Sequence, residues 1–144
     1  NHPAGSLGRK LTITVNDVMI PRDEFSSLQE ESSVIDVIYQ MTLNGIGCCW
    51  IQDSTFDFSL IGIITDGDLR RSLKKTSPNK WGELKARDLM TNNPITIEPT
   101  VMAIDALNLM EKNIKKPVNI MPVTTEKKEF LGFLRLHDLI QKGI

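Results

Sequence analysis

The chain has 144 residues, of which 40% are hydrophobic and 24% charged, and its formal net charge is -1. This length suits one compact unit or two half-size units that share a core, and the composition is that of an ordinary globular protein. A net charge near zero gives no bulk attraction to nucleic acid or an anionic membrane, and no apolar run reaches the length of a membrane span, so we expect neither partner.

The chain begins with a polar stretch, and the first elements follow it. Residues 1–10 have the composition of a linker, and we expect them to connect this chain to a preceding domain that is missing from it. Leu11–Val15 alternates in the way that predicts a strand. Asn16 or Asp17 can cap a short helical turn, and Phe25–Leu28 is predicted to be extended.

A helix, two strands and a second helix are predicted next. Ser32 or Ser33 can cap the first helix, and Gly45 can end it in the left-handed conformation. Its apolar stripe at helical spacing consists of Val34, Val37, Ile38 and Met41. Strands are expected over Cys48–Gln52 and Leu60–Ile64, and a helix is expected from Thr65 or Asp66 towards Lys75.

The same order of elements returns after a joint at Thr76–Glu83. The expected elements of the second copy are a turn at Arg87–Met90, an extended piece at Ile95–Ile97, a helix capped by Thr100, strands at Val118–Val123 and Phe130–Leu134, and a helix from about His137 to Lys142. Met19 recurs as Met90 and Gly62 as Gly132, at offsets of 71 and 70 residues. This small drift indicates duplication with short loop insertions.

The predicted fold class is α+β (α/β-like), with two β-α-β-β-α repeats packed sheet to sheet around a pseudo-two-fold axis. We place the first repeat at residues 11–80 and the second at residues 81–144. A unit of about 60 residues buries too little apolar area to be stable alone, so the free faces of the two sheets should pack on each other. The cleft between the copies is then the expected site.

The end of the predicted strand Leu60–Ile64 carries the most specific short motif. Thr65 can accept from the free N–H groups of the following helix, which also favour an anion such as a phosphate. Asp68 can accept two hydroxyl groups, as a carboxylate does when it binds a ribose. The alternative is that Thr65 and Asp68 form only a capping box and bind no ligand.

The second copy differs at the corresponding corner. Arg135 stands where Thr65 stands, His137 replaces a glycine, and Asp138 keeps the carboxylate. A cation and an imidazole beside a carboxylate could bind a phosphate or a sugar acid, or Arg135 could simply pair with Asp138 at a solvated rim. Thr96 is the third residue expected to face the cleft.

No catalytic set or metal site is predicted within the chain. The histidines are His2 and His137, and no His-rich or Cys-rich spacing or Gly-rich phosphate loop occurs. The adjacent Cys48 and Cys49 lie in a predicted strand, where successive side chains point to opposite faces, so the pair cannot chelate a metal. We expect no bound cofactor or metal and no catalysis by this chain alone.

The duplicated plan resembles a tandem of CBS (cystathionine β-synthase) domains from about Leu11 to Lys142. The resemblance rests on the Asp-Val-Met and Arg-Asp-Leu-Met openings and on the Gly-hydrophobic-hydrophobic-Thr-x-x-Asp-Leu ending. It implies a disc-like module whose cleft binds adenosyl or other nucleotides, through Thr65 and Asp68 in one half and Thr96 and Asp138 in the other. Arg135 departs from the usual Ser or Thr, which puts a second symmetrical adenosine site in doubt.

A narrower resemblance is to the C-terminal part of the D-arabinose 5-phosphate isomerase family. It rests on the residues 2–11, 64–71, 106–110 and 136–139. It implies a missing N-terminal sugar isomerase domain, to whose active site His2 would contribute catalytically in the full-length protein. It also implies a cytoplasmic homo-oligomer built on a homodimer of CBS pairs.

The resemblance leaves two functions open. The first is a regulatory module that binds a nucleotide or nucleotide-sugar effector, such as CMP-Kdo, in the metabolism of the sugar acid Kdo. The second is an oligomerisation scaffold for the isomerase with no specific ligand.

Overall fold

Two three-stranded sheets form the framework of the molecule, and the computed structural model describes residues 11–112 and 118–144. One sheet has the order β1-β6-β5, from Ile20–Pro21, Phe130–Arg135 and Ile120–Thr124. The other has the order β2-β3-β4, from Cys48–Gln52, Leu60–Thr65 and Thr91–Asn92. All of these pairings are antiparallel.

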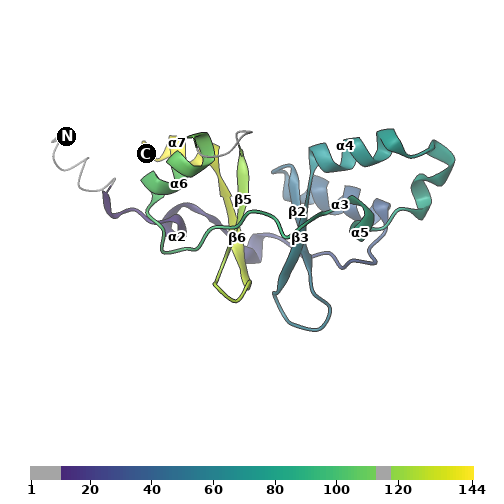
Figure 1. The fold of residues 1–144 in the computed structure, drawn as a ribbon, viewed down its shortest axis with the longest axis horizontal. Helices are drawn as coiled ribbons and strands as arrows, with labels where there is room; N and C mark the ends of the chain where they lie inside the picture. The colour runs from purple at the N-terminus through teal and green to yellow at the C-terminus, as the bar shows by residue number, and fades with distance from the viewer. Residues whose placement is uncertain (1–10, 113–117) are drawn as a thin grey trace.

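Helices cover the outer face of each sheet (Figure 1). The α-helices are α2 (Val15–Val18), α3 (Val34–Asn44), α4 (Asp66–Lys75), α5 (Ala86–Leu89), α6 (Ala103–Lys112) and α7 (Leu136–Gln141), and the 3-10 helices are η1 (Arg22–Glu24) and η2 (Pro78–Glu83). None of the helices among the described residues is long and apolar enough to cross a membrane.

Helix α3 begins and ends as its sequence predicts. The hydroxyl of Ser33 accepts from the backbone N–H of Asp36 at 3.1 Å, which satisfies one of the free donors at the helix start. Gly45 ends the helix with φ 66°, in the left-handed region that glycine adopts without steric cost. Val34, Val37 and Met41 are buried along one face.

Each spatial half is assembled from both repeats. Helix α2, from the first repeat, buries Val15 and Val18 in the hydrophobic core formed by α6, α7, β5 and β6. Helix α5, from the second repeat, buries Ala86 and Leu89 in the core formed by α3, β2 and β3. Strands β1 and β4 are exchanged in the same way: β1, from the first repeat, pairs with β6, and β4, from the second repeat, pairs with β3 (Figure 1). Neither half therefore has a complete core without the other repeat.

A third cluster of buried side chains joins the inner faces of the two sheets. It consists of Phe25, Cys48, Trp50, Leu60, Ile63, Phe130 and Phe133. Trp50 of β2 stacks on Phe130 of β6, with ring centroids 4.2 Å apart and planes inclined by 20°. The hairpins also meet, since Phe130 donates its N–H to the carbonyl of Phe58 at 2.7 Å. The predicted packing of sheet on sheet is confirmed.

Two predicted elements differ from the structure for one reason. The predicted strand at Leu11–Val15 does not form, since Val15 already begins α2, and only Thr14 makes a bridge, with Met102. That bridge holds Met102 extended, so the helix expected from Thr100 begins at Ala103, whose N–H donates to Ile13 at 2.8 Å. The N-terminal segment thus pairs with the second repeat, a contact that local periodicity does not reveal.

Candidate ligand-binding site

The first strand-to-helix corner lies where β3 ends at Thr65 and α4 begins. Thr65 accepts from the backbone N–H of Asp68 at 3.1 Å, and Asp68 accepts from the backbone N–H of Thr65 at 2.9 Å. These two bonds are a complete capping box. The capping interpretation of this motif is therefore realised, and any ligand must bind to a carboxylate that already has partners.

Asp68 has two further partners at this corner. Arg71 donates to Oδ1 of Asp68 at 2.8 Å, and the hydroxyl of Thr91 lies 3.3 Å from both carboxylate oxygens. The Asp68 side chain is 13% exposed. Thr91 lies on β4, from the second repeat, and the sequence gives no signal for its contact with a residue 23 positions earlier.

The second corner lies where β6 ends at Arg135 and α7 begins. The guanidinium of Arg135 binds Asp138 with both prongs, from Nε to Oδ2 at 2.8 Å and from Nη2 to Oδ1 at 2.9 Å. The two side chains are 31% and 21% exposed. The predicted pair therefore forms, and a two-pronged geometry orients the guanidinium as well as neutralising the carboxylate.

A cavity of about 380 Å³ opens beside the second corner. Its lining consists of Ile46, Asn119, Ile120, Arg135, Leu136, His137 and Ile140. It combines apolar walls with one guanidinium, one imidazole and one amide, which is the usual composition of a small-molecule site. Arg135 and His137, two of the predicted ligand-binding residues, therefore line the same cavity.

The loop before β2 connects the two corners. Ile46 lines the cavity of the second corner, while the carbonyl of the next residue, Gly47, accepts from the N–H of Asp66 at the first corner at 3.0 Å. Gly47 has φ 72°, and a Cβ there would come within 2.8 Å of an Asp66 carboxylate oxygen. The corners therefore lie on the same side of the molecule, where α4 and α7 begin in Figure 1.

Thr96 is not joined to either carboxylate. It is exposed on the segment between β4 and α6, next to Ile97, which bridges to Val123 of β5. Within the described ranges its side chain makes no hydrogen bond to Asp68 or Asp138. His2, the predicted catalytic residue of the full-length protein, lies outside the described residues.

The two cysteines occupy opposite faces of β2. Cys48 belongs to the cluster between the sheets, and Cys49 packs under α3. Burial raises the pKa of the Cys49 thiol to about 12, with a further contribution from Asp66. Burial likewise raises the pKa of Cys48, so both remain unreactive thiols at neutral pH. Among the residues described, no group of three His, Cys, Asp or Glu side chains could hold a metal ion.

Comparison with known proteins agrees with this architecture. The CBS domain family matches residues 86–143. Over all 144 residues the chain is 34% identical to "Arabinose 5-phosphate isomerase KdsD" of Escherichia coli K12 and 32% identical to that of Yersinia pestis. The chain spans 42% of the length of these relatives.

Solved structures share the fold. The complex of CBSX2 with AMP has a TM-score of 0.75 at 22% identity, over 91% of this chain and 96% of that one. The CBS domain of a bacterial CNNM/CorC family Mg²⁺ transporter in complex with ATP has a TM-score of 0.76 at 15% identity, over 96% of this chain and 92% of that one. The chain has the fold of a pair of CBS domains, and its sequence matches the C-terminal part of arabinose 5-phosphate isomerases.

Proposed function

We propose that this CBS pair is a regulatory module that binds a nucleotide or nucleotide-sugar at its strand-to-helix corners. The observation that carries the proposal is the cavity at the second corner, where Arg135 and His137 meet the apolar side chains of Ile46, Ile120 and Ile140. The apolar side chains can contact the ring of a ligand, and Arg135 and His137 can contact its acidic group. The AMP and ATP complexes of proteins with the same fold support this ligand class.

The two corners favour different parts of such a ligand. At the first corner Asp66 and Asp68 repel phosphate, whereas Asp68 can accept ribose hydroxyl groups in exchange for its weak contact with Thr91. At the second corner Arg135 can turn its donors from Asp138 to a phosphate or carboxylate. CMP-Kdo carries a cytidine, a phosphodiester and a carboxylate, so it is the effector that we propose.

Ligand binding should raise the melting temperature of this chain. A ligand of the folded state at 100 times its Kd stabilises by about 2.7 kcal/mol, which corresponds to a shift of roughly 5–10 °C in a domain of this size. We expect the Arg135→Ala variant to bind CMP-Kdo about tenfold more weakly, since it loses a charge-assisted contact. Thermal shift with CMP-Kdo, CMP, AMP and ATP measures both effects.

The matched control for that experiment is Arg87→Ala. Arg87 pairs with Glu31 on the surface of α5, is not among the residues that line the cavity of the second corner, and its side chain is 48% exposed. This variant should keep the full ligand-induced shift. If none of the four compounds moves the melting temperature of the unsubstituted chain, the sensing function is wrong and the scaffold function remains.

The scaffold function has its own structural support in an exposed apolar face of α3. Ile35, Tyr39 and Leu43 follow one another at intervals of four residues and are 69%, 65% and 61% exposed. A helix face of this kind is unusual on a monomer and typical of an interface. We propose that two CBS pairs associate through α3, a contact that is compatible with ligand binding at the corners.

A charged side chain introduced on this face of α3 should dissociate the proposed dimer. We expect Leu43→Glu to lower the molar mass in solution to that of one chain, because the interface would have to bury an unpaired carboxylate. Phe56→Glu is the control, since Phe56 is 69% exposed at the tip of the β2–β3 hairpin. Light scattering after gel filtration measures the mass, and a dimer that persists in Leu43→Glu contradicts the assignment of α3.

We also propose that the pair regulates an N-terminal isomerase domain of a cytoplasmic, KdsD-like protein. The identity with KdsD over the whole chain supports this, together with the 58% of KdsD that lies beyond the match (100 minus 42). In such a protein His2 would belong to the isomerase active site. Ligand binding can regulate that domain only if the two ligation states differ in their contacts with it.

A further inference from the structure

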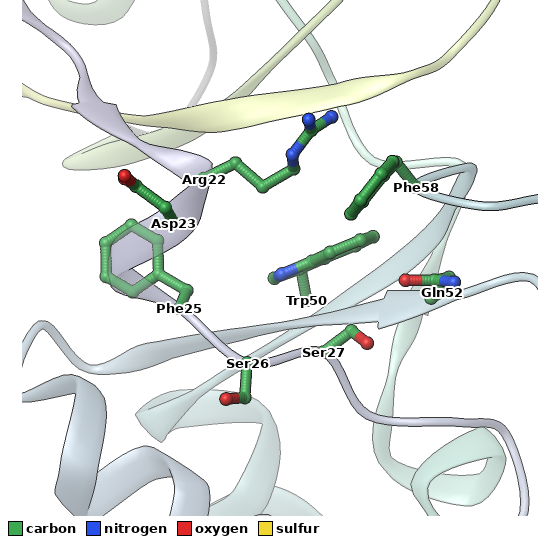
Figure 2. Close-up of a pocket in the computed structure, with 8 residues that line it drawn as sticks. All are labelled: Arg22, Asp23, Phe25, Ser26, Ser27, Trp50, Gln52 and Phe58. Carbon is green, nitrogen blue, oxygen red and sulfur yellow. The ribbon is translucent and has the colours of Figure 1, made fainter.

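A second cavity, of about 490 Å³, lies between the sheets on the side of the hairpins. Its lining consists of Arg22, Asp23, Phe25, Ser26, Ser27, Trp50, Gln52 and Phe58 (Figure 2). It shares no residue with the cavity of the second corner and none with the Thr65–Asp68 corner. Three of its eight lining residues are aromatic, which suits a planar ring.

Several polar side chains around this cavity make no hydrogen bond to another of the described residues. Trp50 is 1% exposed, and its indole N–H has no hydrogen-bond acceptor among the described residues. Buried indole N–H groups are usually hydrogen-bonded, so an orphaned one is costly. The side chains of Ser26, Ser27 and Gln52 also make no hydrogen bond to another described residue. Donors and acceptors are therefore available on several sides of the cavity.

Arg22 closes the cavity and holds the two halves together. Its guanidinium lies 3.6 Å from the centroid of the Phe58 ring, pairs with Glu129 at 3.1 Å and donates to the carbonyl of Phe130 at 3.1 Å. Figure 2 shows Arg22 and Phe58 on one side of Trp50 and the two serines on the other. The guanidinium is thus already neutralised, and Asp23 adds a negative charge.

We infer that this cavity is a second site, which binds an uncharged planar heteroaromatic ring such as that of a nucleoside. The ring would lie among the aromatic side chains, as bases do on aromatic platforms in nucleic-acid-binding proteins. One of its acceptors would take the indole N–H of Trp50, and Gln52 and the serine hydroxyls would meet its remaining polar edges.

Charge and access limit the ligand further. The three charged groups, Arg22, Asp23 and Glu129, sum to -1, so a phosphate is repelled and a nucleoside binds better than its monophosphate. The indole N–H is closed off from solvent, so the wall beside it must move slightly as the ring enters. Relief of the unpaired donor favours that movement.

The two tryptophans provide a probe and a control within the same protein. The chain contains only Trp50 and Trp81, so its ¹H–¹⁵N spectrum has two indole signals, and Trp81→Phe assigns them. Trp81 donates its indole N–H to the carbonyls of Leu73 and Thr76, at 2.9 Å each, at the end of α4. Titration with cytidine or adenosine should shift the Trp50 signal saturably and leave the Trp81 signal in place.

Two variants separate this site from the corners. Ser27→Leu fills the cavity and should weaken the Trp50 shift at least tenfold, while an unmoved Trp81 signal and an unchanged melting temperature show that the variant is folded. Asp68→Ala should keep the Trp50 shift and weaken nucleotide binding at the corner. The inference is overturned if the Trp50 signal does not move, if it moves equally in Ser27→Leu, if Asp68→Ala abolishes the shift, or if the monophosphates bind better than the nucleosides.

Discussion

Replacing Gly132 with alanine should destabilise the protein more than the addition of a methyl group at any other position in its sheets. A Cβ at Gly132 would overlap the carbonyl oxygen of Ile20 and lie 3.2 Å from the Cα of Pro21. Both are backbone atoms of β1, so no side-chain rotation relieves the overlap, and β1 must leave β6. We expect a loss beyond the roughly 1–3 kcal/mol that is usual for overpacking.

The matched control is Gly62→Ala, the same change at the equivalent position of the other repeat. A Cβ at Gly62 would lie 2.8 Å from the sulfur of Met90 and 2.9 Å from the carbonyl oxygen of Thr91. The Met90 side chain can rotate away and β4 needs a shift of a fraction of an ångström, so the cost should stay within the usual range. Urea unfolding measures both variants, and equal midpoints would contradict the explanation based on β1.

The sequence predicted the elements whose signals are local. The caps of α3 at Ser33 and Gly45, the pair β2–β3 and the start of α4 after Thr65 form as expected. The predicted stripe on α3 is correct except at Ile38, which is 41% exposed. Each depends on residues within about eight positions of one another, such as a hydroxyl beside a free N–H group or apolar side chains at helical spacing. The 70-residue offset then predicted the second half from the first.

The exchange of segments between the halves could not be predicted in this way. Helix α2 is apolar on one face, and that face fits the core of either half equally well by composition. Each exchanged strand pairs at a glycine that lets the two backbones approach closely, β1 at Gly132 of β6 and β4 at Gly62 of β3. Contacts that follow from the exchange of β1 and β4, such as that of Thr91 on β4 with Asp68, join residues from different repeats and leave no local pattern.

The corner motif was also less specific than its spacing indicated. A carboxylate three residues after a helix start accepts from the first backbone N–H at Asp17 and Asp88 as well as at Asp68, each at 2.9 Å. At the exposed Asp17 this bond from Thr14 is the main cause of a lowered pKa. Capping alone therefore explains the spacing of this motif, so the spacing by itself does not identify a ligand-binding site.

Replacing Phe130 with alanine should weaken both the fold and the proposed binding. Phe130 is fully buried, stacks on Trp50, and meets the Phe133 ring at a centroid distance of 5.1 Å. Its removal leaves a cavity between the sheets, and such a change costs about 3–5 kcal/mol. Urea unfolding should show this loss, while Phe56→Ala, at an exposed hairpin tip, should stay within about 0.5 kcal/mol of the unsubstituted chain.

The effect of Phe130→Ala on ligand binding tests whether the halves act as one unit. The cavity of the second corner takes Ile46 from one half and Arg135 from the other, so its shape depends on the packing of the sheets that Phe130 supports. If the halves loosen, Ile46 no longer keeps its place beside Arg135, and the ligand-induced thermal shift should fall even in molecules that remain folded. A full shift in Phe130→Ala, together with the expected loss of stability, would mean that each corner binds with residues of its own half alone.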